Sequence, residues 1–291
     1  MDLEKISRYL GSACTHPGRA LIAGFSEVTR IPILVDFNID GDGLIRGELP
    51  DSIVRYMYLM EGKRGYEPET VLMMEKVIKE KNIVMVVGAH IGIHAIRAKQ
   101  LVGDEGMVFG FEPTPETFNI LQLNCRDRGI IVEPRAVTKS DIDKIKMTAF
   151  DVRHSAWNSG LEPRSKRTGC WNPKKLKVPA TSIDVYCNDW FIKPDVLILD
   201  LENGEMDALL GGEKTIRANM PSIIIECGDL GREKENSTNA CLSLLKSWGY
   251  VLLETDSQTG KLCRHEVMVD YPDDYPNVLA VKKSMADNVI N

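Results

Sequence analysis

The sequence predicts an α/β fold, in which a mostly parallel sheet of seven strands, with an antiparallel last strand, carries helices on both faces. Seven nearly continuous apolar runs of strand length recur along the chain. Segments with helical spacing separate most of them, which is typical of parallel strands joined by crossover helices. Only a loop over 256–276 joins the last two runs, so we expect these two strands to pair antiparallel. The seven runs are 83–88, 107–112, 129–137, 195–200, 222–227, 250–256 and 277–283.

Helices are expected between these strands. One starts at Gly92, and the others span 115–124, 205–219 and 239–248. A further helical pattern runs from Asp51 to the first strand, with breaks near Gly65 and Pro68. The interval 138–194 interrupts the regular alternation, and long loops on α/β sheets commonly serve a binding site.

Residues 1–66 are expected to form an extension that packs on the main domain over 67–291. A short helix over 2–11 precedes two strand-like segments, 31–37 and 43–49, and the NIDGDG stretch between them is a natural hairpin turn.

The same turn matches the start of a calcium-binding loop, with oxygen ligands at Asn38, Asp40 and Asp42. Leu49 stands where such a loop needs its last, bidentate glutamate, and Pro32 breaks the helix that should enter it. The sequence therefore favours the hairpin, and it predicts no metal site.

Composition favours a globular protein of a reduced compartment. Hydrophobic residues make up 43% of the chain and charged residues 27%. The first ten residues are charged rather than signal-like, and no apolar run approaches the ~20 residues that cross a bilayer. Seven cysteines without a CxxC pair disfavour both a disulfide framework and structural zinc. We expect a cytoplasmic protein with no membrane span, and the sequence leaves its oligomeric state open.

Charge is distributed unevenly along the chain. Residues 135–180 hold eleven lysines and arginines against four acids, a local net charge of +7, so the rest of the chain carries −13. Trp157, His154 and Trp171 lie in the same segment. A solvated loop explains this segment, and a basic lip over a site for an anionic or sugar-like substrate is the alternative. The overall acidity and the lack of an RNA-binding module disfavour a nucleic-acid partner.

The turn after the first core strand is the strongest sign of a ligand site. Gly88 ends an apolar run, Gly92 follows, and the pattern then becomes helical. Glycines let the backbone approach a ligand, and the helix N-terminus offers free N–H groups. Glu112 ends the second strand 24 residues after Gly88, where a carboxylate can accept hydrogen bonds from ribose hydroxyls. Together these features predict a cofactor that contains adenosine.

S-adenosylmethionine fits this pattern better than a nicotinamide dinucleotide. A dinucleotide turn reads GxGxxG, and His90 stands in place of the middle glycine. The sheet also ends in an antiparallel pair of strands instead of a second mononucleotide-binding half.

Several segments in a fixed order resemble the FkbM family of S-adenosylmethionine-dependent methyltransferases. They are GYEPETVLMMEKVIKEKN, VVGAHIGIHAIRA, GMVFGFEPTPETFNILQLN, EPRAV, VPATSID, VLILDLENGEMDALLGG and PSIIIE. They cover residues 65–227, and a continuation to 283 is plausible. The resemblance implies a Rossmann-like methyltransferase sheet and O-methylation of a hydroxyl on a sugar or small metabolite, so the acceptor would be a small molecule or glycan.

The resemblance also implies roles for particular residues. Asp200 and Glu202 would face the transferred methyl group, where a hydroxyl acceptor benefits from a general base. Glu205 opens the next helix, and we expect it only to favour the helix start. The implied cofactor contacts are Gly88, Ala89, His90 and Gly92 at the methionine end, Glu112 and Pro113 at the ribose, and Arg135 and Ala136 at the adenine.

Three positions depart from the family pattern. Val86 replaces an acid expected near the ammonium group of the cofactor, Ile198 replaces a lysine, and Asn203 replaces a glycine. Losing one charge-assisted hydrogen bond costs ~1.5–3 kcal/mol, which weakens a cofactor site without abolishing it. Another acid, such as Glu67, could compensate. The departures leave one rival open, a degenerate binding protein that keeps the fold. The basic segment with Trp157 and Trp171 suggests a second rival, an RNA methyltransferase.

Overall fold

The computed structural model describes residues 16–39, 43–60, 66–140, 142–149, 174–228, 234–272 and 275–290. The expected helix over 2–11, the centre of the expected hairpin turn, and His154, Trp157 and Trp171 lie outside the described residues.

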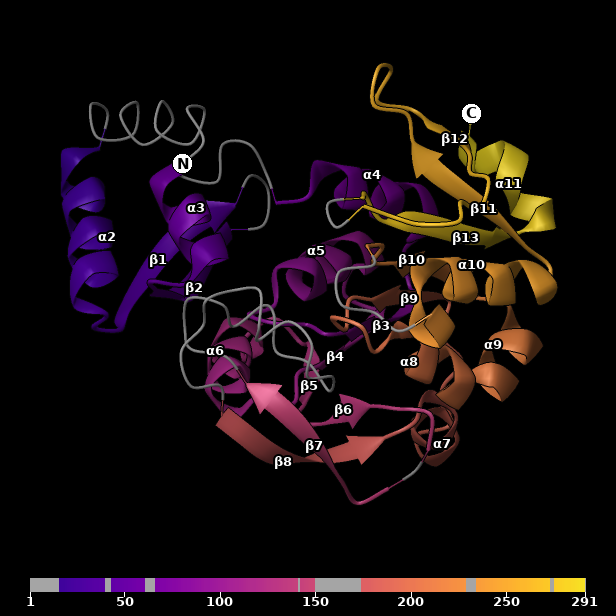
Figure 1. The fold of residues 1–291 in the computed structure, drawn as a ribbon, viewed down its shortest axis with the longest axis horizontal. Coiled ribbons are helices and arrows are strands. Elements are labelled where there is room, and N and C mark those ends of the chain that lie inside the picture. The colour runs from indigo at the N-terminus through magenta and orange to yellow at the C-terminus, as the bar shows by residue number, and fades with distance from the viewer. Residues whose placement is uncertain are drawn as a thin grey trace.

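A central sheet of eight strands, in the order β12-β11-β13-β10-β9-β3-β4-β5, organises the described chain (Figure 1). Its five strands from β10 to β5 pair in parallel, and β13, β11 and β12 add antiparallel pairs at the other edge. The antiparallel pairing of the last two predicted strands is therefore confirmed. The bounds are β3 Ile83–Val87, β4 Met107–Phe111, β5 Ile131–Glu133, β9 Val196–Leu199, β10 Ser222–Ile225, β11 Tyr250–Thr255, β12 Leu262–Arg264 and β13 Val278–Lys282.

The strand count differs from the predicted seven for two local reasons. The short strand β12 lies in the expected loop and pairs with β11 as a hairpin. The predicted strand over 129–137 is divided near Pro134, where β5 ends and β6, Ala136–Val137, begins in a different sheet. Proline lacks the N–H that a ladder needs, so a strand is readily interrupted there.

Helices cover both faces of the central sheet, as predicted. Side chains of β3 alternate, so Val84 and Val86 face one apolar core while Met85 and Val87 face the other. The first core lies under α4 Pro68–Val77, α5 Ile93–Val102, α6 Pro115–Cys125 and α11 Lys283–Ile290. The second lies under α7 Ile183–Asp189, α8 Glu205–Gly211, α9 Glu213–Asn219 and α10 Thr238–Ser247. The expected helix over 205–219 is thus two helices that meet at Gly212.

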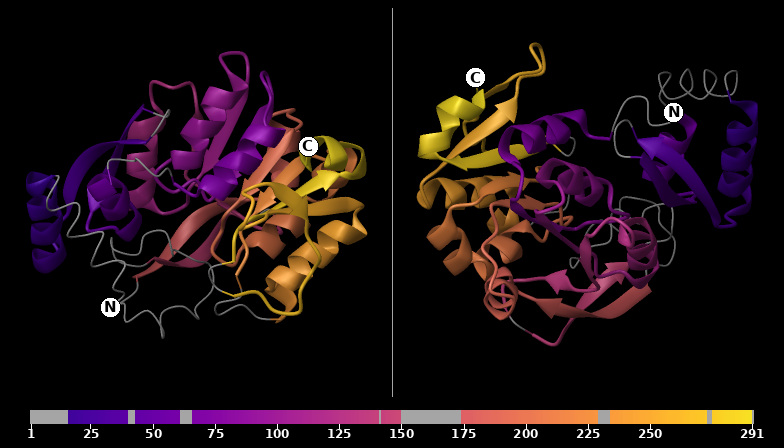
Figure 2. Two further views of the ribbon diagram at one scale, coloured as in Figure 1. Left: turned by 90° about the horizontal axis from the view of Figure 1, so that it is seen from above. Right: turned by 180° about the vertical axis from the view of Figure 1, so that it is seen from behind.

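A second sheet of three strands replaces part of the expected loop over 138–194. It contains β6, β8 Lys174–Thr181 and β7 Lys144–Ala149, in that order. Its apolar face, which includes Met147 and Val178, forms a small core of its own. Lys146 and Lys177 lie directly opposite each other on the other face. Figure 1 and Figure 2 show this sheet next to the β5 side of the central sheet.

The N-terminal residues form the predicted hairpin. Strands β1 Ile33–Ile39 and β2 Gly43–Leu49 pair antiparallel, and α2 Pro17–Thr29 and α3 Ser52–Met60 flank them. The side chain of Asn124 in α6 exchanges two hydrogen bonds with the backbone of Arg46, at 2.8 and 2.9 Å. These bonds fix the hairpin to α6. Within the described residues, no helix is both long enough and apolar enough to cross a bilayer.

Candidate active site

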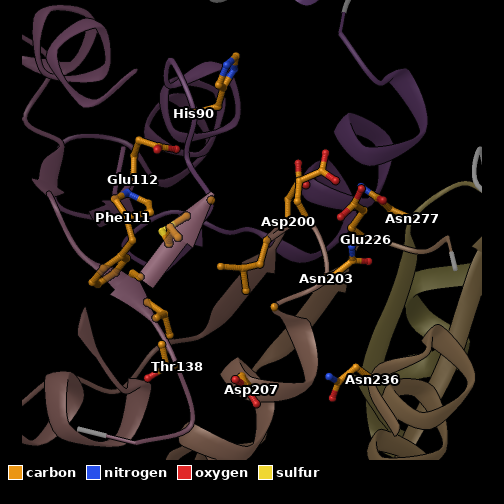
Figure 3. Close-up of a pocket in the computed structure, with 18 of the residues that line it drawn as sticks. His90, Phe111, Glu112, Thr138, Asp200, Asn203, Asp207, Glu226, Asn236 and Asn277 are labelled. Atoms are coloured by element: carbon orange, nitrogen blue, oxygen red, sulfur yellow. The ribbon is translucent and has the colours of Figure 1, made fainter. Parts of the chain in front are cut away.

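One cavity of about 680 Å³ lies at the carboxyl-terminal ends of the central parallel strands. Pockets of this size hold ligands as large as a nucleoside cofactor together with part of an acceptor. In the strand order, Gly88 after β3 lies between Glu112 after β4 and Asp200 after β9. Figure 3 shows Glu112 on one side of this cavity and Asp200 with Glu226 on the other. Of the ten site residues predicted from the sequence, eight line the cavity: Gly88, His90, Glu112, Pro113, Arg135, Ala136, Asp200 and Glu202.

The two predicted residues that do not line the cavity shape the turn instead. The N–H groups of Gly88 and Ala89 both donate to the carbonyl of Phe111, at 3.0 and 2.8 Å. Gly92 has a φ of +100°, and a Cβ there would lie 2.9 Å from Leu121 of α6. Ala89 and Gly92 therefore fold the turn and seat it against its neighbours, while Gly88 and His90 face the ligand space.

Glu112 is a buried carboxylate that is oriented by backbone donors. Its side chain accepts hydrogen bonds from the N–H of Thr114, at 2.8 Å, and from the N–H of His90. Only 7% of the residue is exposed. Burial raises the pKa of Glu112 to about 7, and the hydrogen bonds only partly oppose this. The carboxyl group is therefore divided between its two protonation states near neutral pH, and a ligand hydroxyl can hydrogen-bond to either form.

The wall beyond β5 carries the residues predicted for adenine. Arg135 and Ala136 line the cavity, and Arg135 pairs with Glu133 at 3.5 Å. Further along this wall, the second sheet contributes Ile145 and Met147 to the lining. The wall is thus largely apolar, with a few cations at its edge, which suits a flat aromatic ring.

Three acids converge on the opposite side of the cavity. Carboxylate oxygens of Asp200, Glu202 and Glu226 lie within 4.8 Å of one another. Burial, and then the nearby charge of Glu226, raise the pKa of Asp200 well above its usual range, and a hydrogen bond joins the two groups. Such a cluster can hold a shared proton, a divalent cation or a positively charged part of a ligand.

Backbone strain concentrates around this cavity. Among the described residues, eight other than glycine have a positive φ. Four of them line the cavity: Glu67, His90, Glu202 and Asn203. Left-handed conformations of non-glycine residues are costly and cluster at functional sites. Asn203, with a φ of +82°, stands where the family pattern has glycine, and asparagine tolerates this conformation better than most residues.

The other departures from the pattern lie in the core. Val86 and Ile198 are each 1% exposed, and neither lines the cavity. Val86 and Ile198 lie side by side on the paired strands β3 and β9, beneath α4 and α5. Glu205 begins α8 and accepts a hydrogen bond from the N–H of Leu201 at 2.9 Å. It is also fully buried, and its charge contributes to the raised pKa of Asp200, so it does more than favour a helix start.

Sequence reasoning missed several residues of the site. Glu226 follows β10, so the same strand-end rule that selected Glu112 and Asp200 could have found it. Tyr275 and Asn277 precede β13 in a loop without a recognisable motif, and Asn236 follows residues that lie outside the description. Their approach to the site depends on tertiary packing that the sequence does not signal.

Solved structures with similar folds include three methyltransferase-type proteins. An FkbM methyltransferase from Methylobacillus flagellatus has a TM-score of 0.44 and 15% identity over 78% of this chain and 52% of that protein, so this chain spans about half of its length. An S-adenosylmethionine-dependent O-methyltransferase from Thermotoga maritima has a TM-score of 0.39 and 13% identity, with coverages of 86% and 77%. Fibrillarin from Aeropyrum pernix, solved with S-adenosylmethionine, has a TM-score of 0.40 and 12% identity, with coverages of 72% and 72%.

A family profile identifies the family of this chain, which these structural similarities alone do not. No curated protein matches the chain at a significant level. A family profile described as the methyltransferase FkbM domain matches residues 87–252. This match spans β3 to β11, including Gly88, Glu112 and Asp200, and confirms the predicted resemblance. Because it covers more than half of the chain, the protein belongs to the FkbM methyltransferase family.

Proposed function

We propose that this protein uses S-adenosylmethionine to methylate a hydroxyl group of a sugar or another small metabolite. The main support is the arrangement of acids in one cavity, with Glu112 on one side of the glycine turn and Asp200 with Glu226 on the other. Glu112 can hydrogen-bond to the ribose of a nucleoside. Asp200 with Glu226 can serve a reacting hydroxyl that lies beside a cationic methyl donor.

The residues of the cavity fit the cofactor. Gly88 brings backbone without a side chain to the cavity wall, and Glu112 presents a carboxyl group held by backbone donors. In this proposal Glu112 binds the ribose, Pro113 shapes the turn beside it, and the wall at Arg135 and Ala136 covers the adenine. When bound, S-adenosylmethionine supplies an electrophilic methyl group on a positively charged sulfur.

The acidic wall then orients the acceptor and takes up its proton. Methyl transfer is an in-line displacement, so alignment of the hydroxyl oxygen provides much of the rate. Burial and the charge of Glu226 raise the pKa of Asp200, which favours its protonated form. A positive charge nearby lowers the pKa of this pair, which leaves a carboxylate that can accept the hydroxyl proton. We assign this role to Asp200, with Glu202 beside it.

The acceptor side of the cavity suits a compound rich in hydroxyl groups. Amide side chains, which both donate and accept hydrogen bonds, and a carboxyl group, which accepts them when ionised, line it as sugar hydroxyls require. They are Asn203, Asp207, Asn236 and Asn277. Lys139 and Lys146 stand at the edge formed by the second sheet and can contact an anionic substituent.

A degenerate, non-catalytic protein is the rival that deserves a direct test, because Val86 removes an acid of the family pattern and lies buried in the core. The experiment is calorimetric titration with S-adenosylhomocysteine, followed by transfer of a labelled methyl group to a panel of sugars and glycosides. Micromolar binding with transfer that Asp200→Asn abolishes supports the enzyme. Binding without transfer to this panel contradicts the proposed acceptor class, and no binding up to millimolar concentration supports the rival, whose cofactor site would be retired.

A further inference from the structure

Glu67 is an acid of the cavity wall to which no motif assigns a role. It directly precedes α4 and lines the same cavity as Asp200 and Glu226. Its negative charge contributes to the raised pKa of Asp200. The helix α4, which Glu67 precedes, packs against β10, the strand that ends just before Glu226. Glu67 therefore stands towards the Asp200 and Glu226 side of the glycine turn.

A network of donors holds this carboxylate in place. His94 Nε2 contacts Glu67 Oε2 at 3.0 Å, and the hydroxyl of Thr70 donates to the same oxygen at 3.2 Å. Tyr66 also hydrogen-bonds to Glu67, and its ring packs on His94 with centroids 5.3 Å apart. Because His94 is the second residue of α5, the network fixes Glu67 to the first turn of the helix that follows Gly88.

The same network extends to the loop before β13, where Asn277 lies beside Glu226 (Figure 3). The side-chain amide of Asn277 donates to the Thr70 hydroxyl at 2.9 Å, so the loop before β13 supports the orientation of Thr70. Glu67 has a φ of +46°, and its side chain does not cap its own helix. The backbone is thus held in an unfavourable conformation that turns the carboxylate towards α5 and the cavity.

The charge state of Glu67 differs from that of the other acids. Burial acts to raise the pKa of Glu67, but hydrogen bonds from His94, Tyr66 and Thr70 and the charge of His94 outweigh it and lower the pKa. Glu112 and Asp200 both have raised pKa values. Of these three acids, Glu67 is the one whose pKa is lowered, so its ionised form is favoured, and 35% of its side chain remains exposed.

We propose that Glu67 binds the ammonium group at the amino-acid end of the cofactor. This inference rests on the proposed use of S-adenosylmethionine. If the ribose binds at Glu112 and the cofactor extends past Gly88, its amino-acid end lies on the Asp200 side of the cavity. An ammonium group at that place is bound best by an ionised carboxylate that is held in orientation. Three donors occupy lone pairs of Glu67, and a carboxylate offers about four such positions, so one remains for the ligand.

The test compares two ligands and two variants by calorimetry. S-adenosylhomocysteine carries the amino-acid end, and 5′-deoxy-5′-methylthioadenosine has the same nucleoside and thioether without it. Glu67→Gln should weaken S-adenosylhomocysteine by about 10- to 100-fold, the value of a charge-assisted hydrogen bond. Binding of methylthioadenosine should change by less than about two-fold, because that ligand lacks the interacting group.

Glu75→Gln is the matched control. Glu75 also lies on α4 and also pairs with a basic residue of α5, Arg97, but it does not line the cavity. We expect this variant to bind both ligands as the wild type does. If Glu67→Gln does not fold, Thr70→Val provides the second variant, because it removes one donor that orients Glu67 and should weaken only S-adenosylhomocysteine.

The outcomes separate this inference from the proposed function. An unchanged affinity for S-adenosylhomocysteine in Glu67→Gln, or an equal loss for both ligands, overturns the role of Glu67 and leaves cofactor use intact. A wild-type protein that binds neither ligand overturns the proposed function itself.

Discussion

The backbone carbonyl oxygen of Asp200 lies 1.7 Å from the place where any residue other than glycine would carry a Cβ at position 88. Gly88 also has a φ of +88°. The N–H of Asp200 donates to the carbonyl of Val87 at 3.0 Å, so the two strand ends are held together at this point. The glycine is required both by its backbone conformation and by the close approach of β9, which carries the acid of the site.

Gly88→Ala should therefore lower stability and cofactor affinity together. A contact this short with a backbone atom cannot be relieved by a rotamer change, and we expect a loss of more than about 3 kcal/mol in the free energy of unfolding. Gly249→Ala is the control, because Gly249 has a similar φ of +93° with no atom near its Cβ position. Its cost should stay near 1 kcal/mol. Equal losses in denaturant titrations of the two variants would contradict the contact argument.

Glu112→Gln should stabilise the protein at alkaline pH while it weakens binding. The pKa of Glu112 rises from an ordinary 4.5 to about 7 in the fold, so folding favours the protonated form. Stability from this group is complete below pH 4.5 and is lost as pH rises to 7, by about 3 kcal/mol in all. Glutamine resembles the protonated acid and avoids that loss.

The measurement is the free energy of unfolding of wild type and Glu112→Gln at pH 5 and pH 8. The advantage of the variant should grow between the two pH values, while its affinity for S-adenosylhomocysteine falls by about 10-fold through loss of a hydrogen bond to the ribose. An advantage that is the same at both pH values would show that Glu112 does not titrate in this range.

Binding of S-adenosylmethionine should release more protons than binding of S-adenosylhomocysteine. Asp200 has a pKa well above its usual range, and a cation lowers the pKa of a nearby carboxyl group. Only the first ligand carries a positive sulfur, so it should favour loss of a proton from Asp200. Calorimetry at neutral pH in buffers of different ionisation enthalpy counts these protons. Asp200→Asn should abolish the difference, and a difference that survives in this variant would assign the proton to another group.

The sequence predicted the site best where strand ends define it. Apolar runs located β3, β4 and β9, and the rule that ligands bind at the carboxyl ends of parallel strands selected Glu112 and Asp200. The same rule applied to β10 would have added Glu226. Glu67 could be named but not placed, because its approach depends on the packing of α4 against α5 and on His94.

The sequence was less informative where pairing is long-range. Residues 144–149 and 174–181 pair across an interval that lies outside the described residues, and their lysines hide the alternation that marks a strand. The eighth strand β12 has three residues, which is too short for a recognisable pattern. Val86 was compared with a family pattern as a possible loss of function, yet the sequence could not indicate that its side chain faces the core.

Val86→Asp should therefore destabilise the protein without improving the cofactor site. The Val86 side chain is 1% exposed and packs in the core between β4 and β9, so an aspartate there would bury a charge among apolar groups. We expect a loss of about 3 kcal/mol in the free energy of unfolding.

Val86→Asn and Val84→Asp serve as controls for the charge and for the position. A fall in melting temperature with unchanged or weaker binding of S-adenosylhomocysteine fits a site adapted to valine. Tighter binding in Val86→Asp alone would instead show that the aspartate reaches the ligand, and that the site has lost a contact which Glu67 does not replace.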